Sequence, residues 1–215
     1  MDFAVIGLGR FGSSVAKTLH QLGHNVLALD KDEHAVNAII EHVTQAMQID
    51  STDPEALKAV GITNFDAVIV AIGVNIQESI LTTLILKELG VKKVIAKAVD
   101  ELQGKVLEKI GADMVVFPER DMGVRLAHTL CSPNVVDFLQ LSPEYSVEEV
   151  VVPEKFDGKT LKELDLRSRF GVNVLLIRRD SELIISPTGE TTLRCGDILV
   201  VVGENKQLSR LEAFL

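Results

Sequence analysis

Short apolar runs alternate with amphipathic stretches through the first half of the chain. An apolar run at residues 3–6 opens this part, and apolar residues then recur with helical spacing at 14–22, 33–41 and 53–60. This alternation is typical of βαβ units, in which each helix packs its apolar face on a parallel sheet. Six such runs predict one doubly wound α/β domain. The predicted strands cover residues 2–6, 25–30, 45–49, 66–72, 93–98 and 114–117.

The stretch at 76–89 carries apolar residues on more than one side of the expected helix. A helix that is apolar over most of its circumference must be buried on more than one side. We expect one side to face the sheet. The other side indicates either a contact with a second subunit or a position between the sheet and a second domain.

The pattern changes after the sixth predicted strand. A helical stretch leads to a breaker at Ser132-Pro133-Asn134, and from residue 145 short apolar runs predominate. We predict a nucleotide-binding domain over 1–140, which includes a crossover helix at 119–132, and a small α+β domain over 145–215. A domain of about 70 residues buries little core and often dimerises. Its expected strands lie at 147–152, 174–178, 183–185 and 198–202.

Composition and charge narrow the class of protein. Hydrophobic residues make up 47% of the chain and charged residues 25%, which is close to the averages for folded soluble proteins. The apolar runs are far shorter than the roughly 18 residues that cross a bilayer, and the start of the chain has no secretory-signal pattern. We therefore expect a cytoplasmic protein. The net charge of -9 argues against a nucleic-acid partner, because phosphate-backbone binding requires a basic face.

A glycine-rich loop follows the first predicted strand. Gly7, Gly9 and Gly12 form the pattern G-x-G-x-x-G between that strand and the first helix. Glycines allow a tight turn and a close approach to phosphate oxygens, and the helix start offers free N–H groups. Asp30 ends the second strand about 20 residues later, where a carboxylate accepts hydrogen bonds from ribose and repels a 2′-phosphate. This combination favours an adenine nucleotide other than NADP over a purely structural glycine turn.

Arg10 adds a guanidinium to the loop, where the helix dipole alone usually suffices. It suits a terminal di- or triphosphate, although a solvated loop arginine would look the same in sequence. Asp50, with Ser51 beside it, ends the third strand and either bounds the adenine edge or only forms a turn.

Three common catalytic patterns are absent from the sequence. We find no Ser-His-Asp order, no zinc spacing and no P-loop lysine. The histidines lie in or beside expected amphipathic helices, where solvated side chains are the rule, and the small second domain offers little room for a substrate cleft. We predict that the chain is not an enzyme. The fingerprint itself also permits an NAD-dependent oxidoreductase or an NADH-sensing regulator.

Five segments of the chain carry a resemblance to a known family. They are residues 3–12 (FAVIGLGRFG), 50–53 (DSTD), 68–73 (VIVAIG), 118–122 (PERDM) and the tail 145–215. In these segments the chain resembles the RCK (regulator of potassium conductance) proteins, and among them the TrkA-like KtrA/KtrC type of cytosolic subunit in Ktr potassium uptake systems. The resemblance covers essentially the whole chain.

The resemblance implies a Rossmann-type N-terminal domain (RCK_N) and a C-terminal ligand-binding domain (RCK_C), assembled as an octameric ring of dimers. The ring would lie at the inner face of the cell membrane, beneath a potassium-translocating subunit of the KtrB/KtrD type. ATP would favour the conducting state and ADP the inactive one. Glu119 matches a carboxylate that holds Mg²⁺, Ca²⁺ or Na⁺ near the phosphates, or else it complements a helix dipole. The expected nucleotide contacts are Gly7, Gly9, Arg10, Phe11, Gly12, Asp30, Lys31, Asp50, Ser51, Ile72, Gly73, Asn75 and Lys97.

Members of this family also bind cyclic di-AMP between two C-terminal domains. The resemblance places that site at Arg167, which would meet a phosphate, at Asn173 and Val174, and at Pro187. The chain departs from the family pattern at Lys162, where an apolar residue commonly walls the adenine.

Overall fold

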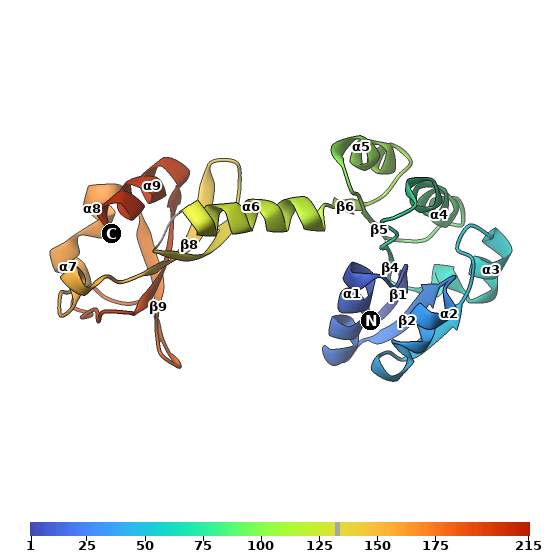
Figure 1. Ribbon diagram of the computed structural model, residues 1–215, viewed down its shortest axis with the longest axis horizontal. Helices are drawn as coiled ribbons and strands as arrows, with labels where there is room; N and C mark the ends of the chain where they lie inside the picture. Colours follow the sequence, from blue (N-terminus) through green and yellow to red (C-terminus); the bar gives the residue numbers. More distant parts are fainter. Residues whose placement is uncertain (132–133) are drawn as a thin grey trace. The chain divides into compact units, whose positions relative to one another are not determined.

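The computed structural model describes residues 1–131 and 134–215 (Figure 1). The chain divides into two compact units, Met1–Glu119 and Arg120–Leu215. We expected the division near residue 140. In the structure it falls earlier: β7 (Val135–Gln140) pairs antiparallel with β8 (Tyr145–Val151) in the second sheet, and most of the preceding helix also belongs to the second unit. The crossover helix is α6, Pro118–Cys131, and the expected breaker residues Ser132 and Pro133 lie outside the described residues.

The N-terminal unit is built on a six-stranded parallel sheet with the order β3-β2-β1-β4-β5-β6. All six strands predicted from the sequence are present, and the expected Rossmann-type fold class is confirmed. The order reverses direction at β1, which pairs with β2 on one side and with β4 on the other. The strands are β1 (Asp2–Ile6), β2 (Asn25–Asp30), β3 (Gln45–Gln48), β4 (Ala67–Val70), β5 (Val94–Lys97) and β6 (Met114–Val116).

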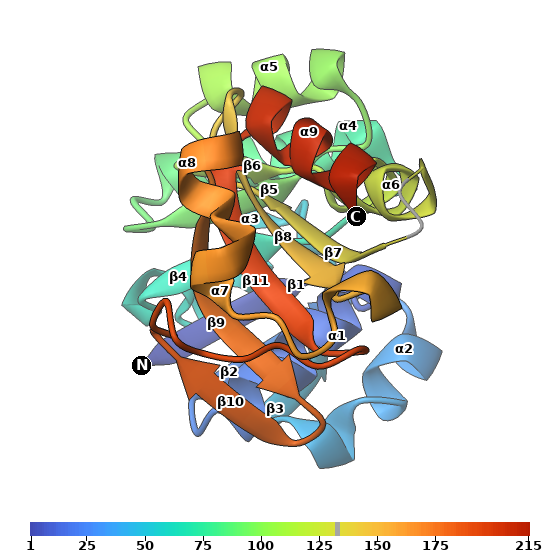
Figure 2. The same ribbon diagram turned by 90° about the vertical axis from the view of Figure 1, so that its left-hand side faces the viewer.

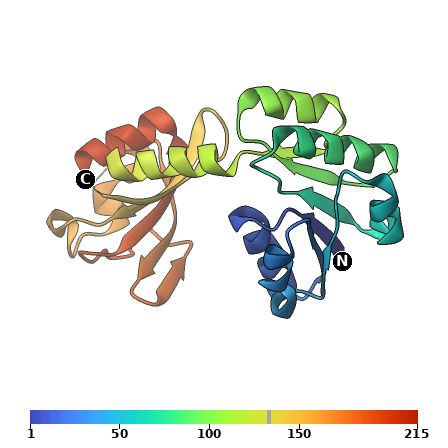
Figure 3. The same cartoon turned by 45° about the vertical axis from the view of Figure 1, so that its right-hand side comes forward.

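Helices cover both faces of this sheet because the strand side chains alternate between two cores. Ile6 packs in one core with side chains of α3, α4 and α5, whereas Val5 packs in the other with side chains of α1 and α2. Figure 3 shows α4 and α5 next to each other on their face of the sheet. The helices are α1 (Arg10–Gln21), α2 (Glu33–Asn37), α3 (Pro54–Ala59), α4 (Ile76–Glu88) and α5 (Glu101–Lys109), with 3-10 turns at Ile40–His42 and Ile62–Asn64.

Helix α4 faces the sheet with a mixed surface. Ser79, Thr82 and Thr83 are fully buried, and the hydroxyl group of Thr83 donates to the Ser79 carbonyl oxygen at 2.8 Å. Ile76 and Leu81 remain 39% and 44% exposed. The apolar residues that suggested a second buried side therefore include side chains that this chain leaves open to solvent.

The C-terminal unit is a five-stranded antiparallel sheet with the order β10-β9-β11-β8-β7. Helices α7, α8 and α9 lie on one face of it (Figure 2). Leu208 and Leu211 of α9 are fully buried against strand residues such as Leu199. The remaining elements are β9 (Asn173–Arg179), β10 (Glu182–Ile185), β11 (Ile198–Glu204), α7 (Leu161–Leu164), α8 (Leu166–Phe170), α9 (Asn205–Phe214) and a 3-10 turn at Glu154–Phe156.

Candidate nucleotide-binding site

A pocket of about 500 Å³ opens at the carboxyl ends of β1, β2 and β4. It lies where the strand order reverses, which is the position at which open α/β sheets bind their ligands. The residues that line it are Ile6, Gly7, Leu8, Gly9, Asp30, Lys31, Asp32, Ala35, Ile49, Ser51, Ala71, Ile72, Gly73, Val74, Asn75 and Glu78.

The three glycines of the loop have different structural roles. Gly7 has φ +93°, and a Cβ there would come within 3.0 Å of the Ile72 nitrogen. A Cβ on Gly12 would lie 1.8 Å from the Gly7 carbonyl oxygen, so only glycine lets α1 start this close to β1. Gly9 has no atom within 4 Å of its Cβ position. The space beside Gly9 is thus open for a ligand to approach the backbone.

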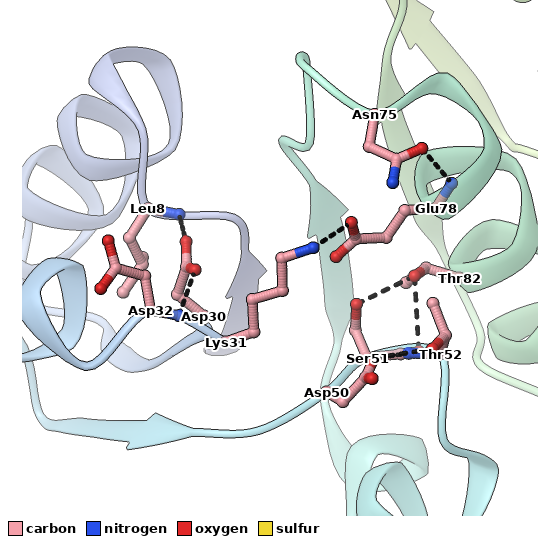
Figure 4. A network of polar contacts seen from close by, with 10 residues as sticks. All are labelled: Leu8, Asp30, Lys31, Asp32, Asp50, Ser51, Thr52, Asn75, Glu78 and Thr82. Carbon is pink, nitrogen blue, oxygen red and sulfur yellow. Dashed lines mark hydrogen bonds and ion pairs between the residues drawn. The ribbon is translucent and has the colours of Figure 1, made fainter.

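Asp30 holds the glycine loop in place. One oxygen of its carboxylate accepts a hydrogen bond from the Leu8 amide at 2.6 Å, and the other accepts from the Asp32 amide at 2.9 Å (Figure 4). A carboxylate oxygen has more than one acceptor position. Asp30 can therefore orient the loop and still accept from a ribose hydroxyl.

An ion pair reaches across the pocket from the residue after β2 to α4. The Lys31 ammonium lies 2.5 Å from the Glu78 carboxylate, whose side chain is only 11% exposed (Figure 4). The hydrogen bond from Lys31 to Glu78 raises the pKa of Lys31. Asn75 caps α4, because its side-chain oxygen accepts from the Glu78 amide at 3.1 Å. The first turn of α4 is thereby fixed at the pocket wall.

Ser51 and Asp50 differ in position. Ser51 is buried, lines the pocket and shares a hydrogen bond of 2.9 Å with the Thr82 hydroxyl. Asp50 is exposed and accepts from the Thr52 hydroxyl at 2.6 Å and from the Thr52 amide at 2.9 Å, which together lower the pKa of Asp50. Of the two predicted contacts at this edge, Ser51 is the one among the pocket-lining residues.

Lys97 and Glu119 form a second charged group near the loop. The ammonium of Lys97 lies 2.6 Å from the Glu119 carboxylate, and the Lys97 side chain is 10% exposed. A Cβ on Gly73 would lie 2.8 Å from that ammonium, so Lys97 sits directly behind the pocket lining. The hydrogen bond from Lys97 lowers the pKa of Glu119, and the charge of Arg10 adds to this effect. The ring of Phe11 is 5.9 Å from the Lys97 ammonium.

The structure brings most of the predicted nucleotide contacts together. Eight of them line the pocket: Gly7, Gly9, Asp30, Lys31, Ser51, Ile72, Gly73 and Asn75. Arg10, Phe11, Gly12, Asp50 and Lys97 lie next to it without lining it. The lining residues that the sequence reasoning missed include Leu8, Asp32 and Glu78. An acidic residue three positions after the N-cap Asn75 is the signal that could have identified Glu78.

The metal prediction rests on Glu119, which this structure pairs with Lys97. Within residues 1–131 and 134–215, no three His, Cys, Asp or Glu side chains gather in a way that could hold a metal ion. A cation beside Glu119 would need further oxygen ligands from a bound phosphate or a second subunit.

A second pocket of about 390 Å³ lies in the C-terminal unit. The four residues predicted there, Arg167, Asn173, Val174 and Pro187, all line it. Lys162 also lines it, and its ammonium is 3.2 Å from the exposed Glu190 carboxylate. The residue that departs from the family pattern is therefore part of this pocket.

Comparison with known proteins decides the family. Residues 3–118 match the TrkA-N domain and residues 147–215 match the TrkA-C domain. The chain is 50% identical over 211 residues to Ktr system potassium uptake protein C of Bacillus subtilis, covering 98% of this chain and 96% of that protein. This chain belongs to the TrkA-domain family of Ktr potassium uptake proteins. It is also 46% identical over 211 residues to Ktr system potassium uptake protein A of the same species, covering 98% and 95% of the two chains.

Solved structures agree with the fold. The chain aligns with the structure described as the GsuK channel bound to NAD with a TM-score of 0.69 and 20% identity, over 98% of this chain and 38% of that one. The predicted family resemblance is thereby confirmed by the sequence relatives, and the fold by both comparisons. In the part of the chain that the structure describes, no helix is long and apolar enough to cross a membrane.

Proposed function

We propose that this chain is the cytoplasmic regulatory subunit of a membrane potassium transporter and that it responds to ATP and ADP bound at the N-terminal pocket. The observation that carries the proposal is the pocket of about 500 Å³ formed by the glycine loop and Asp30, in a chain that is 50% identical to a Ktr potassium uptake protein over nearly its whole length. The chemistry of the pocket suits a ligand with a ribose and phosphates, and its relatives act in ion uptake.

Discrimination between ATP and ADP must come from groups that contact the terminal phosphate. A ligand shifts a conformational equilibrium only through its different affinity for the two states. Arg10 begins α1 and acts electrostatically on Glu119, and Lys97 lies behind Gly73. In this proposal, these two cations sense the extra negative charge of ATP.

A cation is part of the same proposal. A terminal phosphate near Lys97 competes with Glu119 for the ammonium. Glu119 is 65% exposed and is then free to bind Mg²⁺, Ca²⁺ or Na⁺ together with phosphate oxygens. The bound cation would link the charge of the nucleotide to the start of α6.

The proposed assembly is a homo-oligomer, an octameric ring of dimers that contacts a potassium-translocating membrane subunit. Described side chains on two helices support a subunit contact. On α4 the exposed apolar side chains include Ile76 and Leu81. Helix α6 has no buried residue. The exposed apolar side chains of α6 are Met122, Val124, Leu126 and Leu130.

The second pocket is proposed to bind cyclic di-AMP and to close the transporter. Arg167 supplies a cation for a phosphate, and Asn173 supplies an amide for a base edge. Lys162 replaces an apolar wall with a second cation. Calorimetry with cyclic di-AMP on the full chain tests this proposal. Arg167→Ala should abolish the heat of binding. Absence of such heat in the wild-type chain would show that the pocket does not bind cyclic di-AMP.

Ligand choice at the N-terminal pocket is tested by thermal shift and calorimetry with ATP, ADP, NAD and NADH. We expect ATP and ADP to stabilise the protein most. Asp30→Ala should weaken both, and Asp66→Ala, a carboxylate remote from the pocket that accepts from the Asp2 amide, should not. Preferential binding of NADH would point to an NADH-sensing regulator, and NADH-linked turnover of a substrate would point to an oxidoreductase.

A further inference from the structure

The C-terminal sheet contains a buried acid that the proposed nucleotide response does not use. Glu148 of β8 is 5% exposed. One of its carboxylate oxygens, Oε2, accepts no hydrogen bond from a nitrogen or hydroxyl donor. An unpaired ionised carboxylate inside a protein is strongly unfavourable. Some feature of the surroundings must therefore compensate for its charge or remove it.

The neighbours of Glu148 on the sheet do not supply a positive charge. The register places Phe138 of β7 and Val201 of β11 on either side of it. The exposed His128 of α6 stacks on the Phe138 ring, with centroids 4.1 Å apart. The next residue, Glu149, points to the opposite face of the sheet.

The charged groups on that opposite face are already paired with one another. Arg178 donates to Glu149 at 2.7 Å, and Arg125 forms a bidentate pair with Asp137. These cations are therefore engaged away from Glu148.

The group that meets Glu148 comes from α9, and it is a second carboxylate. Burial is the largest cause that raises the pKa of Glu148, and together with the charge and hydrogen bonding of Glu212 it brings this pKa to about 7. Two carboxyl groups in contact are stable when one of them is protonated and donates to the other. Close by on β8, the Ser146 hydroxyl donates to Asn205 at the start of α9 at 2.8 Å.

We propose that Glu148 and Glu212 share one proton, and that this proton holds α9 on the C-terminal sheet so that docking of the helix responds to pH near neutrality. Loss of the proton leaves two negative charges in contact, one of them on the buried Glu148, and α9 loosens. The end of α9 carries Phe214, whose ring lies 5.1 Å from those of Phe156 and Phe170. Helix α9 also packs on α8, the helix that bears Arg167.

Hydrogen exchange of the α9 peptide in the full chain tests this proposal. The native pair binds its proton more tightly than the opened state does. Opening of α9, corrected for the chemical exchange rate, should therefore rise roughly tenfold from about pH 6 to about pH 8. Glu148→Gln keeps the shape and a donor but cannot ionise, so the rise should fall below about twofold. Glu149→Gln, on the other face of the same strand, should keep the wild-type rise.

Other outcomes overturn the proposal. Corrected exchange in the wild type that is the same at both pH values would show that no proton is shared, and so would a wild-type rise that persists in Glu148→Gln. If Glu148→Gln does not fold, Glu212→Gln takes its place in the comparison with the wild type, and the same loss of the rise is expected. Protection at about pH 8 that appears with millimolar calcium and disappears with EDTA would assign the two carboxylates to a metal ion instead.

Discussion

The Lys97 ammonium lies 2.6 Å from the Glu119 carboxylate, immediately behind the glycine that lines the nucleotide pocket. Lys97 is the last residue of β5, and Glu119 lies in the first turn of α6. This pair joins the pocket to the helix that leads into the C-terminal unit. A change of charge at the pocket can therefore change the contacts at the start of α6.

Replacing Lys97 with methionine removes the ammonium and keeps a side chain of similar length. Because charge-assisted hydrogen bonds are about twice as strong as neutral ones, we expect ATP affinity without added divalent cation to fall by roughly tenfold. Millimolar Mg²⁺ should restore part of the loss, since it can take the place of the ammonium beside Glu119. Calorimetry with and without Mg²⁺ measures this, with Lys97→Arg as the charge-preserving control. An unchanged ATP affinity would show that Lys97 does not contribute to ATP binding.

Gly12→Ala and Gly9→Ala form a matched pair. A methyl group on Gly12 collides with the Gly7 carbonyl oxygen, so we expect a loss of about 2 kcal/mol in the free energy of unfolding. A methyl group on Gly9 meets no atom of the protein and should leave stability unchanged within about 0.5 kcal/mol. If phosphates approach the loop there, Gly9→Ala still weakens ATP binding. Thermal unfolding and calorimetry together separate the two effects, and normal ATP binding by Gly9→Ala would place the phosphates elsewhere.

Arg10→Ala tests the sensing of the terminal phosphate. We expect ATP affinity to fall roughly tenfold while ADP affinity changes by less than about twofold, because only ATP carries the outer phosphate. Lys17→Ala, farther along the same helix α1, is the control for a general loss of positive charge. Equal losses for both nucleotides would contradict the role assigned to Arg10.

The C-terminal unit should lose stability in acid through Asp197. This carboxylate is 3% exposed and is held by Arg179 at 2.6 and 2.9 Å and by the Arg194 amide at 2.8 Å. Burial alone would raise the pKa of Asp197, but these hydrogen bonds bring it below its usual value. The folded-state pKa is thus lower than the unfolded one, so the stabilisation is complete above about pH 4 and is lost as the pH falls.

Asp197→Asn should therefore destabilise the C-terminal unit by about 3 kcal/mol near neutral pH, because it leaves the Arg179 charge without its partner. Below about pH 3 the difference from the wild type should shrink. Scanning calorimetry of the full chain over this range provides the measurement. A constant difference at every pH would show that the ion pair is not the cause.

Much of the fold could be predicted because each strand of the first domain is a short apolar run followed by a helix with one apolar side. The C-terminal helix α9 could not be predicted, because its segment is mostly polar and only a few apolar residues, Leu208 and Leu211 among them, mark its buried side. The division between the two units after residue 119 could not be predicted from the sequence either. Strand β7 is specified by its pairing with β8, a contact that no local pattern reports.

The glycine loop and Asp30 could be predicted because a short motif, with a fixed spacing between the glycines and the acid, is typical of nucleotide binding. The pairing of Lys97 with Glu119 could not, because the two residues come from different elements and meet only in the folded chain. Glu148 was missed for the same reason. In sequence it is one acid in an alternating strand, and only the fold shows that it faces inward toward Glu212.

Native mass spectrometry of the purified chain with ATP, ADP and NADH gives the stoichiometry of the assembly and the identity of its ligand in one measurement. We expect an oligomer of eight chains that carries the mass of ATP or ADP and binds them in preference to NADH. A protein that stays monomeric and binds no adenosine phosphate would contradict this expectation.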